Sequence, residues 1–138
     1  MGYTHYFTTR ATLKNEVWSE LLTDVAKIIS ASGITIGGWD GLGAPTLSSE
    51  KIVFNGSPAY ETFHLPHKGN GFEFCKTARL PYDKVVTAVL IRARDYYGDE
   101  IQLSSDGDWV EWSEGVQLYT QVFDSVPENV FKGASNGE

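Results

Sequence analysis

The sequence predicts a single α+β domain, with a mainly antiparallel sheet and about three helices packed mostly on one face of it. Segments typical of strands and helices follow one another as strand, helix, several strands, helix, strand and helix, an order that favours this class. The chain has 138 residues, which suits one domain with a real core. Aromatic residues make up 13% of it, which argues against disorder. We place the domain at residues 1–126 and expect 127–138 to be a frayed tail.

The first half of the chain opens with a strand and a helix. Residues 3–9 are rich in aromatic and β-branched types, which predicts a strand. Thr12 is a suitable N-cap for the helix that follows, and Gly33 is suited to the left-handed position that ends it. The apolar stripe between them has helical spacing and consists of Val17, Leu21, Val25 and Ile28.

The middle of the chain reads as short strands. Residues 34–36 are a candidate strand, and 37–49, with four glycines and a proline, form a long loop. Residues 51–55 and 60–65 are two strands that we expect a turn at 56–58 to join as a hairpin. Residues 71–76 form a third strand, with Phe72 and Phe74 on one face and Glu73 and Cys75 on the other. Together these three strands predict an antiparallel meander.

Two further helices follow. Pro81 is suited to the start of a second helix and Gly98 to its end. Residues 101–103 form a short strand. The apolar stripe of a third helix, which Pro127 would end, consists of Trp109, Trp112, Val116, Tyr119 and Phe123.

Composition excludes several classes of function. The net charge is −7 and no basic cluster is present, so a duplex nucleic acid is not an expected partner. The one cysteine, Cys75, permits no internal disulfide, which suits a reducing compartment. No signal peptide or membrane-spanning stretch is evident, so we expect a cytoplasmic protein with no membrane partner. His5, His64 and His67 lack metal-ligand spacing, and we expect neither a metal nor a cofactor.

The turn before the second helix carries the most distinctive polar chemistry. Lys76, Thr77 and Arg79 precede a helix N-terminus, where cations, a hydroxyl and free N–H groups can bind an anion. The alternative is that Arg79 pairs with Asp83 or with another nearby carboxylate.

Other candidates also have two interpretations. His5 is either a pocket base or a hydrogen-bonded structural residue. Glu61 and Glu73 either share a pocket, which would raise the pKa of one of them, or pair with cations on a solvated face. Residues 104–106 either hold a sugar hydroxyl or form the turn that caps the third helix. Cys75, which alternates with apolar residues, is more consistent with a buried inert thiol than with a reactive one.

Motifs spread over most of the chain resemble a family of small, largely uncharacterised proteins of bacteria and their phages. The motifs are GYTHYF at residues 2–7, NG at 55–56, ETF at 61–63, FCKTARLPYD at 74–83 and SSDG at 104–107. Phe7 departs from the family, which usually has tryptophan there. The resemblance implies that the polar positions line one site.

We therefore predict a protein that binds a small nucleotide-like or phosphorylated ligand. The predicted site residues are His5, Tyr6, Glu61, Lys76, Thr77, Arg79, Tyr82, Asp83 and Asp106. A phage origin, which the resemblance implies, suggests an anti-defence protein that sequesters a signalling nucleotide in the host cytoplasm. One alternative is an enzyme, a hydrolase or transferase, that uses His5, Glu61 and Lys76. Another is an acidic inhibitor of a partner protein. The oligomeric state stays open, and a homo-oligomer is compatible with the sequence.

Overall fold

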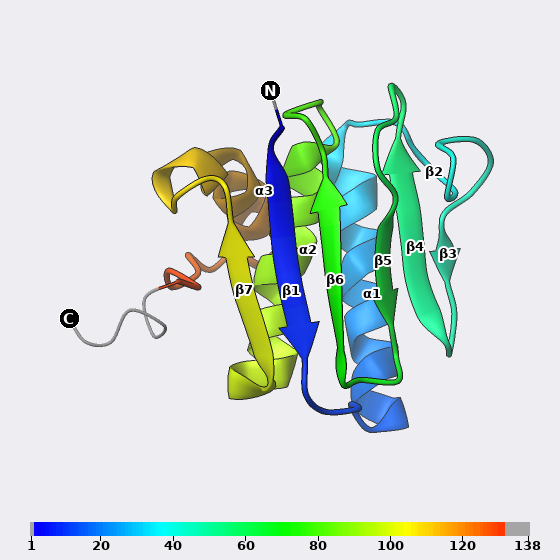
Figure 1. Ribbon diagram of the computed structural model, residues 1–138, viewed down its shortest axis with the longest axis vertical. Coiled ribbons are helices and arrows are strands. Elements are labelled where there is room, and N and C mark those ends of the chain that lie inside the picture. The colour runs from blue at the N-terminus through cyan, green and yellow to red at the C-terminus, as the bar shows by residue number, and fades with distance from the viewer. Residues whose placement is uncertain (1, 132–138) are drawn as a thin grey trace.

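The computed structural model describes residues 2–131 and has strands in one layer and helices in another. Figure 1 shows α1 (Asn15–Ser32), α2 (Asp83–Tyr97) and α3 (Ser113–Phe123) behind the strands, which leaves the other face of the strands open. The strands are β1 (Thr4–Thr9), β2 (Ile36–Gly37), β3 (Thr46–Leu47), β4 (Lys51–Gly56), β5 (Phe63–Pro66), β6 (Gly71–Lys76) and β7 (Ile101–Ser105). The predicted fold class, α+β with helices mostly on one face, is confirmed.

The strands form two antiparallel sheets. In the first, β1 lies between β6 and β7, with His5 opposite Cys75 on one side and opposite Ser105 on the other. In the second, β4 pairs with β2, β3 and β5. The N-terminal strand is thus the centre of the first sheet, and the turns at the ends of β6 and β7 lie beside its first residues.

The predicted meander is wrong for its third strand. The ladder of β6 is with β1, and within residues 2–131 no ladder joins β6 to β5. The antiparallel pairing of β4 with β5 is confirmed, but their connection is longer than the expected turn at 56–58, because β5 begins only at Phe63. The side chain of Asn55 holds the intervening loop instead. Its amide group donates to the carbonyls of Trp39 and Tyr60 and accepts from the N–H groups of Gly56 and Tyr60.

The helices bury the apolar stripes that the sequence predicts. In α1, Leu21, Val25 and Ile28 are fully buried, and Gly33 ends the helix with a φ of 72°. The helix begins later than expected, because the Thr12 hydroxyl accepts a hydrogen bond from the Gly69 N–H and does not cap it.

Helix α2 is the central helix and packs against both α1 and α3. Helix α3 ends at Asp124, which has a φ of 56°, before Pro127 is reached. Beyond it, Val130 is buried, and the Phe131 ring meets the Trp112 ring edge-on at a centroid distance of 4.9 Å. The end of the described chain therefore packs on the fold. The rest of the predicted tail, residues 132–138, lies outside the described residues.

Candidate functional site

The predicted site residues gather at one end of the first sheet but on both of its faces. Residues 4–6 begin β1, residues 76 and 105 end the neighbouring strands, and Asp83 begins α2. Successive side chains of a strand point to opposite faces. His5 therefore faces the helices and is fully buried, whereas Tyr6 faces the open side and is partly exposed. The structure consequently does not bring all nine residues into one pocket.

His5 is the centre of a polar cluster with Thr77, Asp83 and Ser105, in which His5 and Thr77 are buried and Asp83 and Ser105 are partly exposed. Its Nε2 lies 2.7 Å from Oδ1 of Asp83, and its Nδ1 lies 2.8 Å from Oγ of Ser105. The Thr77 hydroxyl donates to the same Asp83 oxygen at 2.5 Å. The cluster thus joins β1 to β7 and to the start of α2.

The donors around Ser105 determine which nitrogen of His5 carries the proton. Oγ of Ser105 accepts from the N–H of Gly107 at 2.9 Å and from Nε1 of Trp112 at 3.2 Å. A hydroxyl oxygen has two lone pairs, and these two donors occupy both of them. The hydroxyl hydrogen of Ser105 therefore points to Nδ1 of His5. In this arrangement Nδ1 of His5 accepts from Ser105, and Nε2–H of His5 donates to Asp83. This geometry favours the structural interpretation of His5.

Glu61 and Tyr82 connect the two sheets. The Glu61 carboxylate accepts from the N–H of Lys76 at 2.8 Å, and the Glu61 N–H donates to the Lys76 carbonyl at 3.1 Å. The fully buried Tyr82 donates its hydroxyl to the Glu61 carbonyl at 2.6 Å. Burial raises the pKa of the Tyr82 phenol well above its ordinary value. These contacts are backbone supports and leave neither group facing a cavity.

Cys75 and Glu73 do not form a shared acidic pocket with Glu61. Cys75 is fully buried, and desolvation by burial raises the pKa of its thiol to about 12. Glu73 lies 3.4 Å from Nδ1 of His64. The thiol therefore matches the inert interpretation, and Glu73 has a cationic partner when His64 is protonated.

Arg79 has a carboxylate partner as well. Its guanidinium donates to Glu111 at 3.0 Å and lies 3.8 Å from the centroid of the Tyr3 ring. Ala78 and Arg79 hold this turn with φ values of 53° and 61°. The N-terminus of α2 carries the carboxylate of Asp83 in its first turn. The turn is thus neutralised by the chain's own acids, which favours pairing over anion binding by Arg79.

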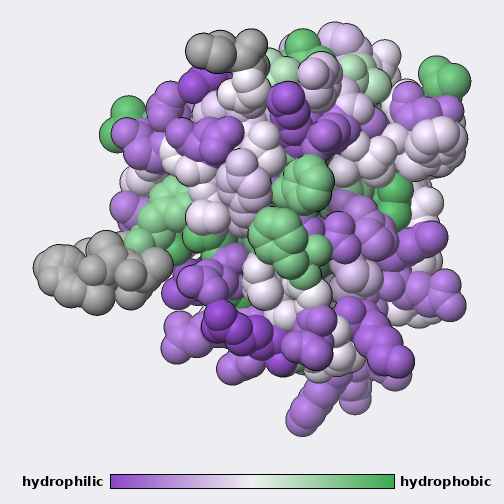
Figure 2. Space-filling model, viewed as in Figure 1, coloured by the Kyte–Doolittle hydropathy of each residue, from purple (hydrophilic) through white to green (hydrophobic). Residues whose placement is uncertain are grey.

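The open face of the first sheet carries exposed aromatic side chains. Phe72 and Phe74 are 59% and 52% exposed, in contrast to the fully buried Cys75 on the other face of β6. The ring centroids of Phe72 and Phe74 lie 6.1 Å apart, and Tyr6 lies 6.3 Å from Phe72 with its ring inclined by only 17°. Figure 2 shows hydrophobic side chains near the middle of this face, ringed by hydrophilic ones. We call Tyr6, Phe72 and Phe74 the aromatic face.

Strand register arranges this surface in rows across β6, β1 and β7. The row at the end of β6 holds a cation and an anion, the next holds two aromatic rings, and the third holds one. From the end of β6, the rows are Lys76, Thr4 and Asp106, then Phe74, Tyr6 and Ser104, then Phe72, Thr8 and Gln102. Three predicted residues, Tyr6, Lys76 and Asp106, thus share one surface.

Lys76 and Asp106 flank the aromatic face, and they differ in how many of their polar atoms already have partners. No carboxylate within residues 2–131 lies at ion-pair distance from Lys76, whose Nζ is 5.8 Å from the centroid of the Tyr60 ring. Asp106 accepts from the N–H of Thr4 at 3.0 Å and, at a long 3.4 Å, from the Tyr6 hydroxyl. Lys76 is free to bind an anion, and one oxygen of Asp106 is free to accept from a ligand.

Sequence reasoning did not include Phe72 and Phe74 in the site. Their alternation with Cys75 was visible, but both faces of the strand carried hydrophobic residues. Which face is covered depends on the pairing with β1 and on the position of the helices, which no local pattern contains.

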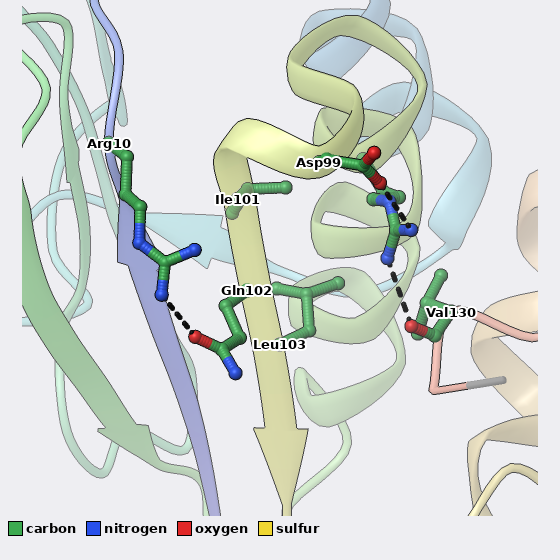
Figure 3. Close-up of a pocket in the computed structure, with 7 residues that line it drawn as sticks. Arg10, Asp99, Ile101, Gln102, Leu103 and Val130 are labelled. Carbon is green, nitrogen blue, oxygen red and sulfur yellow. Dashed lines mark hydrogen bonds and ion pairs between the residues drawn. The ribbon is translucent and has the colours of Figure 1, made fainter. Parts of the chain in front are cut away.

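A groove beside β7 lies apart from these residues. It has a volume of about 190 Å³ and is lined by Arg10, Arg94, Ile101 and Leu103 among others. Arg10 donates to Gln102 at 2.7 Å (Figure 3). Arg94 donates to the Val130 carbonyl at 3.0 Å. The Arg94 guanidinium is therefore engaged in holding the C-terminal segment, and none of the predicted site residues lines the groove.

Residues 2–131 contain neither a metal-ligand cluster nor a membrane-spanning helix. In this part of the chain no three His, Cys, Asp or Glu side chains are grouped as metal ligands. None of its helices is both long and apolar enough to span a bilayer. Comparison with protein-family models, curated proteins and solved structures finds no match to the chain. Function is therefore argued from the geometry.

Proposed function

We propose that this protein binds a small nucleotide-like ligand on the open side of its first sheet. The observation that carries the proposal is the exposure of Phe72 and Phe74 beside Tyr6 on a face that the helices leave uncovered. Exposed rings on a sheet are platforms for unpaired bases, and each base stacked on one contributes ~1–3 kcal/mol.

The polar groups around the aromatic face fit the remaining parts of a nucleotide. Lys76 follows Phe74 by two residues on the same face and supplies a cation for a phosphate. Asp106 and Ser104, at the other side of the face, supply acceptors and a hydroxyl for ribose. The ligand would thus lie across the strands, with its base over the rings.

Charge favours a small ligand over a polymer. The chain carries a net charge of −7, and Lys76 is the one cation in the three rows described above. A long nucleic acid needs many phosphate contacts to offset such repulsion. A duplex would also keep its bases stacked inside and away from the rings.

Binding without turnover is the form of this proposal that the geometry supports. The imidazole of His5 lies on the opposite side of the sheet, with both nitrogens engaged, and the hydroxyl of Ser105 is saturated. The resemblance to a family of bacteria and phages extends the proposal: such a protein would sequester a signalling nucleotide from a host defence system. An exposed aromatic face also fits a partner protein, which is the second candidate.

Calorimetric titration with a panel of nucleotides tests the proposal. We expect a nucleotide to bind, Phe74→Ala and Lys76→Ala to weaken it, and Trp39→Ala to leave it unchanged. Trp39 is a matched control because it is an aromatic side chain, 70% exposed, in the loop after β2. If no nucleotide bound, or if the three variants behaved alike, the proposal would be wrong and a protein partner would become the better explanation.

A further inference from the structure

The aromatic face has two platforms, placed one behind the other along β6. Phe72 and Phe74 are separated by one residue on the same side of the strand, a spacing of about 6.6 Å for the backbone. Their ring centroids lie 6.1 Å apart with planes inclined by 31°, so the rings do not stack on each other and each exposes surface. Tyr6 lies opposite Phe74 in the register, but its ring lies 6.3 Å from the Phe72 ring and nearly parallel to it, so Tyr6 extends the Phe72 platform across to β1.

From this spacing we infer that the ligand is a single-stranded dinucleotide, with one base on Phe74 and the next on Phe72 and Tyr6. The inference rests on the proposed function and adds the ligand's class to it. The separation of the rings is nearly twice the stacked step of ~3.4 Å per nucleotide, which corresponds to two neighbouring bases that have been pulled apart. Sheet proteins that bind single strands use their aromatic residues in the same way, one ring for each base.

Cations lie at opposite corners of the two platforms. Lys76 lies two residues beyond Phe74, at the end of β6. At the other end, Arg10 reaches along the sheet to donate to Oε1 of Gln102, which is in the row of Phe72 (Figure 3). No carboxylate within residues 2–131 is paired with either side chain. One cation therefore lies at each end of the pair of platforms.

Carboxylates at both ends of the aromatic face would repel the phosphates of a longer nucleic-acid strand. Asp106 lies in the row of Lys76, and Glu100 lies next to Arg10, whose N–H donates to the Glu100 carbonyl. A nucleic-acid strand that continued past either platform would bring further phosphates towards these carboxylates, and this repulsion disfavours a ligand longer than two nucleotides.

Titration calorimetry of the full chain with three probes tests the inference. The probes are adenosine monophosphate, the 5′-phosphorylated dinucleotide pApA and a hexa-adenylate strand. We expect pApA to bind at least about tenfold more tightly than the mononucleotide, because a second base stacks. The hexanucleotide should bind no more tightly than pApA once its several registers are allowed for.

Variants of the two platforms separate the outcomes. Phe72→Ala should reduce the affinity for pApA to that for the mononucleotide and leave mononucleotide binding unchanged, whereas Phe74→Ala should weaken both. Trp39→Ala is the control, and thermal unfolding of each variant checks that the fold is intact. Equal affinity for mononucleotide and pApA, with no effect of Phe72→Ala, would overturn the dinucleotide but keep the proposed function. A hexanucleotide that bound much more tightly than pApA would also overturn it. If none of the probes bound, both proposals would fail.

Discussion

Two groups of side chains, supplied in part by neighbouring residues of β1, have opposite characters. The polar cluster of His5, Asp83 and Ser105 looks catalytic in composition, yet its nitrogens and hydroxyl are engaged with one another and with N–H donors. The aromatic face of Tyr6, Phe72 and Phe74 looks like core in composition, yet it lies on the open side of the sheet. Residue type alone would assign these roles the other way round. What distinguishes them is whether each group already has its partners.

The largest expected effect is on the polar cluster. Replacement of His5 by alanine removes one hydrogen bond from the Asp83 carboxylate, leaves the Ser105 hydroxyl hydrogen without its acceptor and opens a cavity. It should therefore lower the free energy of unfolding by roughly 3 kcal/mol or more. Urea denaturation measures this, with Tyr6→Ala as the control on the same strand. A His5→Ala protein that was as stable as the wild type but no longer bound nucleotide would reverse the roles assigned to the two groups.

The next effect concerns the aromatic face and should appear in binding alone. Phe74→Ala removes a platform and should cost ~1–3 kcal/mol of binding free energy for a stacked base. Because its side chain is half exposed, stability should change by less than about 0.5 kcal/mol. Calorimetry and urea denaturation of the same preparation give both values. A loss of stability comparable with that of His5→Ala would mean that Phe74 is a structural residue.

A smaller effect tests the arrangement of donors around Ser105. Trp112→Phe keeps a buried aromatic ring but removes the Nε1–H that donates to Ser105, at a cost of about 1 kcal/mol. Nucleotide affinity should not change, because the ring lies on the helix side of the sheet. Altered affinity in this variant would show that the cluster and the aromatic face are coupled.

The smallest effect concerns the exposed pair of Arg79 and Glu111. The hydrogen bond from Arg79, followed by that from the Asp108 N–H, lowers the pKa of Glu111 below its ordinary value of 4.5. A carboxyl whose pKa is lower in the folded state stabilises the fold above its unfolded-state pKa and loses that contribution as the pH falls through the folded-state pKa. Between neutral pH and pH 3, the wild type should thus lose slightly more stability than Glu111→Gln. Identical pH profiles would mean that the pair contributes nothing measurable.

Local signals explain what could be predicted from the sequence. The strands at residues 4–9 and 71–76 and the ends of helices at Gly33 and Gly98 follow from residue types within a few positions of each other, and they are confirmed. The pairing of β6 with β1 joins residues about 70 positions apart, and the longer connection between β4 and β5 is held by the Asn55 side chain. Neither is visible in a short window.

At the site, too, local signals predict the residues involved, whereas long-range contacts determine their partners. The turn at residues 76–83 was singled out because of its charges, but its partners, Glu111 for Arg79 and His5 for Asp83, come from distant segments. Phe72 and Phe74 were assigned to one side of their strand, but only the positions of the helices show that this side is open. Composition located the region, and long-range packing decided which of its side chains stay available to a ligand.

The central claim is that a ligand binds to the open side of the first sheet, and nuclear Overhauser contacts between pApA and the aromatic rings test it most directly. We expect contacts from the two adenines to Phe72, Phe74 and Tyr6, and none to Trp112 beside His5. Contacts to Trp112 or Tyr3, with the rings of Phe72 and Phe74 unaffected at saturating pApA, would contradict the claim.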